Sequence, residues 1–189
     1  KIWLSDLKIP WQTHGSVSSG WGFIRGKGDR DRSKDHPDFI YNLSHIVGNG
    51  GVYLLNIAPR PDGTIPQAQI DSIMAVGDFL KVNGEAIYDA DPGPYKYPPF
   101  PITSKKGKLY LHLKDMPNNS VSMQGLLTKV TKAYNLADKE QRALNFTQNK
   151  GELNVSLPTS YVDNKYPGVI VLEIDLDKAQ VMDETIVAQ

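Results

Sequence analysis

Hydrophobic and polar positions follow a helical period in the first half of the chain. Over residues 36–47 the apolar side chains fall on one stripe, which predicts a helix that ends at Asn49-Gly50-Gly51. Residues 52–58 then form a nearly continuous apolar run, typical of a strand buried on both faces of a parallel sheet. A second helix is predicted over residues 66–83, with its apolar stripe at Ile70, Ile73, Met74, Gly77 and Leu80. The order helix, buried strand, loop, helix indicates an α/β architecture.

After residue 101 the period changes to two residues. Residues 108–113 alternate between apolar and polar, and strand-like runs separated by turn signals follow at residues 120–127, 129–136, 143–148, 152–157 and 168–175. Short strands at this spacing predict an antiparallel sandwich. Between the two halves, proline is too frequent for a helix or a central strand. We therefore expect an α/β part in residues 1–90, a connector in 91–101 and an antiparallel β-sandwich domain in 102–189.

Charge and composition exclude several classes of function. The 189 residues carry 21 basic and 21 acidic side chains, so no basic field is available for a nucleic acid backbone. Cysteine is absent and the four histidines are scattered, so we expect no metal and no other cofactor. The longest apolar runs are far shorter than the ~20 residues of a membrane span. We predict no nucleic acid partner and no membrane span.

The N-terminal segment carries the densest group of candidate binding residues. Trp11, Gln12 and His14 are followed closely by Trp21, with glycine and serine between them. Aromatic faces beside small residues suit stacking on the apolar C–H face of a sugar ring. Packing of both tryptophans in a core, with a structural role for the histidine, is the alternative interpretation.

Two carboxylates lie near the predicted parallel strand. Asp62 follows that strand, where ligand sites of parallel sheets gather, but Asp62-Gly63 is also an ordinary turn signal. Glu85 follows the second predicted helix, and we expect it to be a surface or capping carboxylate.

Several spaced motifs resemble the α-L-fucosidases of glycoside hydrolase family 29. Residues 50–59 read GGVYLLNIAP, residues 62–66 read DGTIP, and residues 77–88 read GDFLKVNGEAIY. The family pattern has G-G-N-x-L-L-N-I-G-P, D-G-x-I-P and G-x-W-L-x-x-N-G-E-A-I-Y at these offsets, after P-W-E/Q and S-W/F-G-Y blocks. The last two blocks correspond here to Pro10-Trp-Gln12 and Gly20-Trp-Gly-Phe23. Val52, Ala58 and Phe79 replace the Asn, Gly and Trp that the family usually has, which leaves the linkage specificity open.

The resemblance implies a fold class of α/β plus all-β: the last βα units of a (β/α)8-like barrel followed by an antiparallel β-sandwich. It implies hydrolysis of terminal α-L-fucosyl residues with retention, by an aspartate nucleophile and a carboxylic acid/base. Trp21 matches the aromatic residue that contacts the C5-methyl side of fucose in the family. Trp11, Gln12 and His14 are weaker substrate-binding candidates. A secreted, periplasmic or lysosomal location is suggested by the resemblance alone.

The chain is too short for the whole enzyme that it resembles. A complete barrel needs roughly 250 residues, and only about 90 precede the predicted sandwich. The chain also starts at Lys1 rather than at methionine, so we expect a fragment or a processed product. We assign no catalytic residue here, expect the catalytic pair outside this chain, and predict that the isolated chain is inactive. The expected partners are a fucosylated glycan and the missing barrel portion, with self-association as the other way to cover the apolar stripes. The alternative function is a non-catalytic fucosidase-like module, either carbohydrate-binding or structural.

Overall fold

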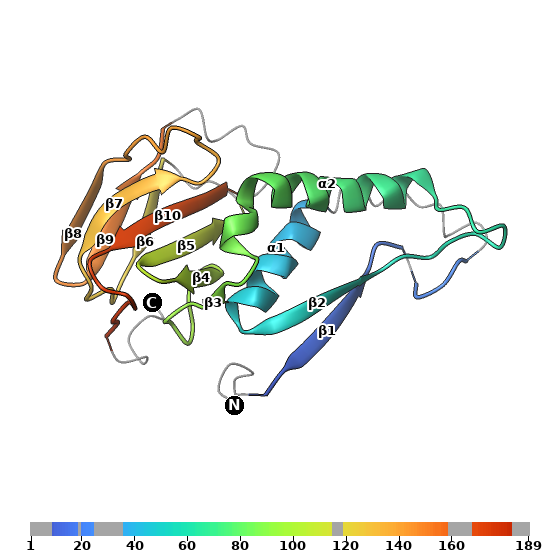
Figure 1. Cartoon of the computed structure of the whole chain (residues 1–189), viewed down its shortest axis with the longest axis horizontal. Helices are drawn as coiled ribbons and strands as arrows, with labels where there is room; N and C mark the ends of the chain where they lie inside the picture. The colour runs from blue at the N-terminus through green and yellow to red at the C-terminus, as the bar shows by residue number, and fades with distance from the viewer. Residues whose placement is uncertain (1–8, 19, 25–35, 115–118, 159–167, 183–189) are drawn as a thin grey trace.

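The computed structural model describes residues 9–18, 20–24, 36–114, 119–158 and 168–182. The α/β part contains strand β1 (Trp11–Ser16), helix α1 (His36–Gly48), strand β2 (Gly51–Asn56), helix α2 (Gln67–Asn83) and the short 3-10 helix η3 (Gly84–Ala86). β1 and β2 pair in parallel, with Trp11 opposite Gly51 and Ser16 opposite Asn56. A parallel pair needs a crossover, and α1 lies in the segment that joins the two strands (Figure 1). The parallel pairing and both helices therefore confirm the α/β prediction.

Two glycines let the aromatic side chains of β1 and β2 lie flat across the neighbouring strand. A Cβ added at Gly51 would lie 2.4 Å from Cζ2 of Trp11, and one added at Gly15 would lie 2.2 Å from the hydroxyl of Tyr53. The indole Nε1 of Trp11 also donates to the carbonyl of Asn49, 3.2 Å away, just after α1. This face of the pair is therefore closed by its own aromatic rings and by α1.

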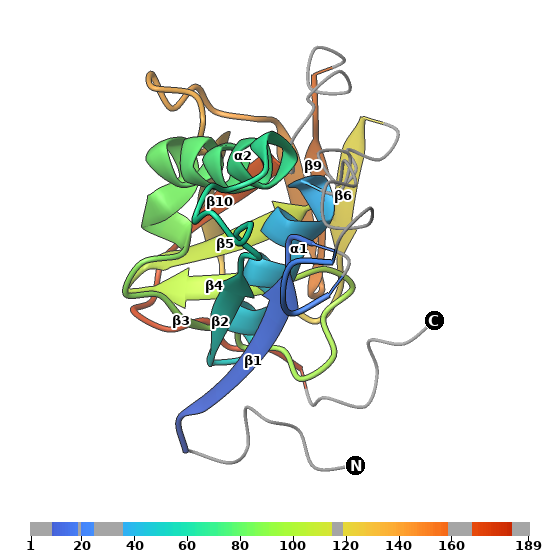
Figure 2. The same ribbon diagram turned by 90° about the vertical axis from the view of Figure 1, so that its right-hand side faces the viewer.

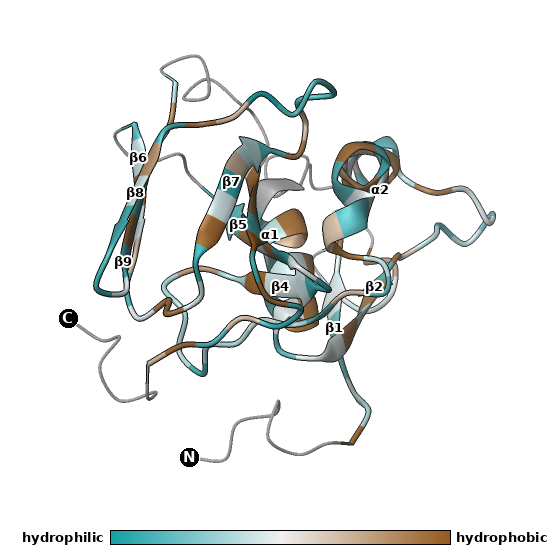
Figure 3. Cartoon of the chain, turned by 60° about the vertical axis from the view of Figure 1, so that its left-hand side comes forward, coloured by the Kyte–Doolittle hydropathy of each residue, from teal (hydrophilic) through white to brown (hydrophobic). Residues whose placement is uncertain are grey.

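The opposite face of the β1–β2 pair is open. Gln12 and His14 on β1 are exposed, as are their register partners Val52 and Leu54 on β2, at 61% and 43% of their surface. The prediction that this strand is buried on both faces is therefore wrong for the described residues, because α1 covers only one side of the pair. Figure 2 shows β1 and β2 in front of α1, and Figure 3 shows hydrophobic stretches along β2 and α2.

Helix α2 turns a more polar face inward than its sequence predicts. Its buried residues are Gln69, Ser72, Ala75, Phe79 and Asn83. Ile70, Ile73 and Met74 of the predicted stripe are instead 36% to 54% exposed. The reason is a contact with the segment after β2, because the Gln69 amide donates to the carbonyl of Ala58 (3.2 Å) and accepts from its N–H (2.8 Å). This pair of buried hydrogen bonds fixes the rotation of the helix at its first turn.

The second half forms two antiparallel sheets packed face to face (Figure 1). The five-stranded sheet has the order β3 (Asp91–Pro92), β4 (Ile102–Lys105), β5 (Lys108–Leu113), β10 (Gly168–Ile174) and β7 (Val130–Asn135). The three-stranded sheet has the order β6 (Ser120–Met123), β9 (Glu152–Ser156) and β8 (Phe146–Asn149). The predicted sandwich is thus observed. β3 falls within the predicted connector and β4 follows it, and the sequence pattern indicated neither strand.

The five-stranded sheet is buried on both faces. Leu111, Ile170 and Leu172 face the three-stranded sheet and belong to the larger core. Tyr110 and Val171, from the same sheet, face the helices in a second core. The members of that second core from the α/β part are Ile40, Phe79, Ala86 and Ile87. The α/β part and the sandwich therefore share a core, which explains why β10 is apolar almost throughout.

Candidate functional site

The carboxyl ends of β1 and β2 hold the main cluster of exposed functional side chains. Asn56, the last residue of β2, donates from Nδ2 to the carbonyl of Trp21 (3.0 Å) and to Oγ of Ser16 (3.3 Å). Its own carbonyl accepts the N–H of Val17 (3.0 Å). Asn56 thus fixes the segment that follows β1 at the edge where ligand sites of parallel sheets occur.

Serines hold this segment in a tight turn. Ser16 donates from Oγ to the carbonyl of Gly20 at 2.8 Å, and Ser18 donates to the same oxygen. Ser18 is buried, at 3% exposure, as is Val17 at 1%. The turn is therefore held by buried residues, and the next residue, Trp21, lies at the surface.

Trp21 and His14 form an aromatic corner at this edge. Their ring centroids lie 5.3 Å apart and their planes meet at 84°. Trp21 is 62% exposed, which is unusual for the largest apolar side chain, and His14 is exposed as well. An indole face at a right angle to an imidazole offers an apolar platform beside a hydrogen-bonding group. Such a corner suits a ligand with one apolar face and nearby hydroxyls.

The structure brings together only two of the four predicted binding residues. Trp11 and Gln12 lie at the start of β1, about 16 Å and about 13 Å from its carboxyl end at a rise of ~3.3 Å per residue. Trp11 is engaged with Asn49 and Gly51, which is a structural role. Gln12 shares the open face with His14 but does not belong to the aromatic corner. Asn56 was missed as a site residue, although its position at the end of a predicted parallel strand was the available signal.

The two carboxylates considered from sequence have structural roles. Asp62 Oδ1 accepts from the N–H (3.0 Å) and the hydroxyl (2.7 Å) of Thr64, so it makes the turn that was predicted. These hydrogen bonds lower the pKa of Asp62.

Glu85 joins the α/β part to the sandwich. Its Oε1 accepts from Nζ of Lys108 (2.8 Å) and from the hydroxyl of Tyr110 (2.7 Å) on β5. The hydrogen bond from Lys108 lowers the pKa of Glu85, while partial burial opposes that shift. Glu85 is therefore an ionised tie between the two parts, and it lies away from the aromatic corner.

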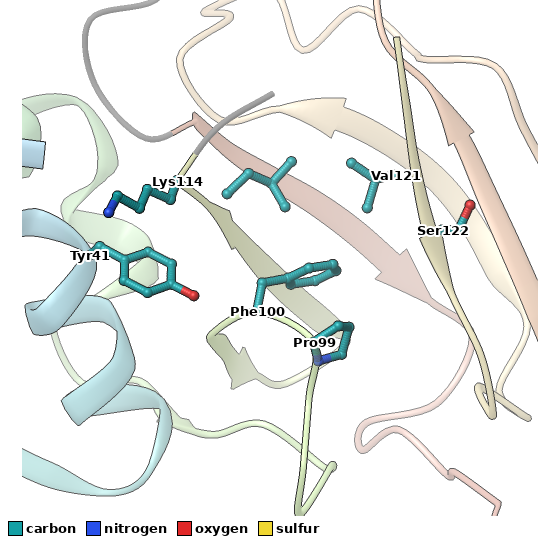
Figure 4. Close-up of a pocket in the computed structure, with 7 residues that line it drawn as sticks. Tyr41, Pro99, Phe100, Lys114, Val121 and Ser122 are labelled. Atoms are coloured by element: carbon teal, nitrogen blue, oxygen red, sulfur yellow. The ribbon is translucent and has the colours of Figure 1, made fainter. Parts of the chain in front are cut away.

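A small hollow lies where α1 meets the sandwich (Figure 4). Tyr41 of α1 faces Phe100 across it, and its volume is about 260 Å³. Lys114 at its rim is 2.6 Å from Oδ1 of Asp38 and lies over the Tyr41 ring at 5.8 Å. The volume is below the ~300 Å³ at which ligand pockets begin, so we interpret the hollow as a packing gap at the junction.

Among the residues that the structure describes, no group of three His, Cys, Asp or Glu could hold a metal ion. Within the same ranges, no helix is both long and apolar enough to cross a membrane.

Comparisons with known proteins agree with the motifs. The family model described as Alpha-L-fucosidase matches residues 4–85. Tissue alpha-L-fucosidase of Homo sapiens is 33% identical over 116 residues, which cover 59% of this chain and 25% of that protein. Tissue alpha-L-fucosidase of Rattus norvegicus is 39% identical over 85 residues, covering 43% of this chain and 18% of that protein.

Solved structures extend the similarity across both halves. Alpha-L-fucosidase isoenzyme 1 from Paenibacillus thiaminolyticus superimposes with a TM-score of 0.77 at 28% identity, over 88% of this chain and 40% of that chain. The Thermotoga maritima alpha-fucosidase, at 19% identity and a TM-score of 0.74, shows the shared fold alone. Together these matches confirm the predicted resemblance: the chain is similar to part of the α-L-fucosidases. It spans about a quarter of the human relative's length.

Proposed function

We propose that this chain is the C-terminal segment of a retaining exo-α-L-fucosidase, which hydrolyses terminal α-L-fucosyl residues of glycans. In this proposal β1, α1, β2 and α2 are the last βα units of a (β/α)8-like barrel. The observation that carries it is the aromatic corner of His14 and Trp21 at the carboxyl end of a parallel strand pair. In barrel enzymes this end of the strands carries the active site.

The open face of the β1–β2 pair supports the barrel assignment. A barrel has helices outside and side chains packed inside. Here α1 covers one face of the pair, while Gln12, His14, Val52 and Leu54 line the other. Further strands of a barrel would bury Val52 and Leu54 on this face. The expected partner of this face is therefore the remaining part of the barrel.

In this proposal the corner binds the sugar and does not perform the bond cleavage. The Trp21 indole contacts the apolar C5-methyl side of fucose, and His14 hydrogen-bonds a hydroxyl. The nucleophile and the acid/base, which a retaining mechanism needs ~5–5.5 Å apart, are expected outside this chain. Asp62 and Glu85 are held in structural hydrogen bonds, which agrees with a catalytic pair located elsewhere.

The open face also weighs against the alternative of a non-catalytic module that works by itself. Such a module would need to bury its own apolar surface. Val52 is 61% exposed and Met74 is 54% exposed, on elements that a complete barrel would cover in part.

Hydrolysis of an aryl α-L-fucoside tests the proposal directly. The complete natural gene product should release the aryl group and give the α-anomer of fucose first, as retention requires. The isolated 189-residue chain should release none. Turnover by the isolated chain would contradict the placement of the catalytic pair, and a gene product without turnover would favour the non-catalytic module.

A further inference from the structure

A groove of about 610 Å³ lies between β3, the β4–β5 hairpin and the segment after β10. Its volume falls in the range of ~300–1,000 Å³ that is typical of ligand sites. It is remote from the aromatic corner. Gly50, just before β2, approaches Pro92 in the groove wall, where an added Cβ would be 3.2 Å from Cγ. From there β2 runs away toward Asn56 for about 20 Å (Figure 1).

Positive charge is concentrated in this groove, although the chain as a whole has a formal net charge of zero. The charged side chains that line it are Lys105, Lys106, Lys108, Lys178, Asp91 and Asp177. Lys105 and Lys108 lie directly opposite each other across the hairpin, and the charge of Lys108 is offset by Glu85, whose Oε1 lies 2.8 Å from Nζ. Lys106 is 3.2 Å from Asp177, but this pair is highly exposed and therefore weak.

The groove is built on a firm frame. Gly107, at the hairpin turn, has φ of +73°, which favours glycine. Its N–H donates to the carbonyl of Asp177 (3.1 Å) and its carbonyl accepts the N–H of Ile174 (3.0 Å), so the turn is tied to the end of β10. Ser104 donates to the carbonyl of Pro92 at 2.8 Å and ties β4 to β3. The lysines therefore project from fixed backbone positions.

Apart from Ser104, the uncharged lining of the groove is apolar and suits a sugar ring. Pro92, Pro94, Leu109 and Ala179 supply this surface. A small inorganic anion would leave most of 610 Å³ unfilled, whereas a sugar residue would use both the apolar lining and the charged rim.

We propose that this groove binds a sulfated sugar residue of a glycan. Lys105 and Lys106 hold the sulfate as point charges, and the proline-lined wall contacts the C–H face of the ring. Asp91, also in the lining, accepts a hydroxyl. The choice of a glycan as the carrier of the anion rests on the proposed function; the preference for an anion rests on the lysines alone.

Titration calorimetry with three probes tests the inference: a sulfated fucose oligosaccharide, the same oligosaccharide after desulfation, and inorganic sulfate. The full chain should bind the sulfated oligosaccharide and show little binding of the other two. The Lys105→Gln/Lys106→Gln double variant should bind it roughly tenfold more weakly, the loss expected for two charge-assisted contacts. Lys129→Gln/Lys139→Gln is the matched control, because it removes the same charge from two exposed positions outside the groove.

Three results would overturn the inference. Equal affinity for the desulfated oligosaccharide would show that the groove does not recognise the sulfate. Equal affinity for inorganic sulfate would show that it does not recognise the sugar. An equal loss in the control double variant would show general attraction to a polyanion. Binding is read without hydrolysis, so failure here leaves the fucosidase proposal intact. Conversely, a failure to hydrolyse an aryl fucoside would contradict the fucosidase proposal and would not affect the binding result for the groove.

Discussion

Acidification should destabilise this fold through one buried histidine, His112 on β5. The side chain is fully buried, and burial lowers its pKa to about 3 from the usual 6.5. The Thr103 hydroxyl donates to the carbonyl of Ala86 (2.7 Å) and lies 2.9 Å from Nε2 of His112. With its one hydrogen committed, the hydroxyl accepts from Nε2–H, which assigns the neutral tautomer. Nδ1 has no hydrogen-bond partner among the described residues, so a second proton there would be unsatisfied.

The sign and the size of the pH effect on stability follow from the linkage between proton binding and folding. Between the folded pKa near 3 and the unfolded value of 6.5, the unfolded chain binds the proton and the folded chain does not. The stability that His112 contributes is therefore complete above pH ~6.5 and declines as the pH falls through this window. At pH 5 the loss is about 2 kcal/mol, from 1.36 kcal/mol for each pH unit below 6.5.

Urea unfolding at pH 7, 6 and 5 measures this effect. His112→Leu introduces an apolar side chain of similar size and removes the titrating group. It should lower stability at pH 7 but flatten the pH dependence by about 2 kcal/mol between pH 7 and 5. His45→Gln is the control, because it removes a histidine that is exposed on α1. If His112→Leu and the original chain lose stability in parallel as the pH falls, the reasoning is refuted.

Three further predictions concern packing and association. Gly51→Ala should destabilise the fold by about 1–3 kcal/mol, because the added methyl group would meet the Trp11 ring. Gly77→Ala, which has open space around it in α2, should stabilise the fold by ~0.5–1 kcal/mol. Equal shifts of the melting temperature in the two variants would contradict this contrast. Glu85→Gln should lower the free energy of unfolding by about 1–2 kcal/mol, because it weakens the hydrogen bonds to Lys108 and Tyr110; the figure is reduced for the partial exposure of Glu85. Asp78→Asn, on the surface of α2, should change the free energy of unfolding by no more than ~0.5 kcal/mol. The isolated chain should self-associate through the open face of the β1–β2 pair in sedimentation experiments. Val52→Thr/Leu54→Gln should reduce this self-association more than Leu127→Gln/Leu176→Gln, which changes exposed residues elsewhere. A chain that is monomeric at all concentrations would contradict the prediction.

Local periodicity was sufficient to predict the helices and most strands. α1, α2 and the strands from β5 onward carry regular apolar patterns, and each is observed near its predicted range. β1 reads WQTHGS and has no such pattern, because its stability comes from its non-local pairing with β2 and from the ring of Tyr53 over Gly15. β3 and β4 lie within or next to the proline-rich segment, where pairing defines them as strands: β4 pairs with β5, and β3 pairs with β4.

The orientation of α2 and the composition of the site also depend on non-local contacts. Hydropathy placed Ile70 and Ile73 inside, but the hydrogen bonds of Gln69 to Ala58 determine the rotation of the helix. Trp21 was predicted from the motif, and the structure places it beside His14. Trp11 was grouped with them because it is close in sequence, although a strand of six residues separates it from the carboxyl edge.

The most direct test of the central claim is the effect of Trp21→Ala on hydrolysis of an aryl α-L-fucoside by the complete natural gene product. Loss of an exposed stacking platform should reduce kcat/KM at least tenfold, a change of about 1.4 kcal/mol in transition-state stabilisation, without a change in melting temperature. Trp11→Phe, at the far end of β1, should instead lower the melting temperature and leave kcat/KM nearly unchanged. An unchanged kcat/KM in Trp21→Ala would contradict the placement of the sugar site at the aromatic corner.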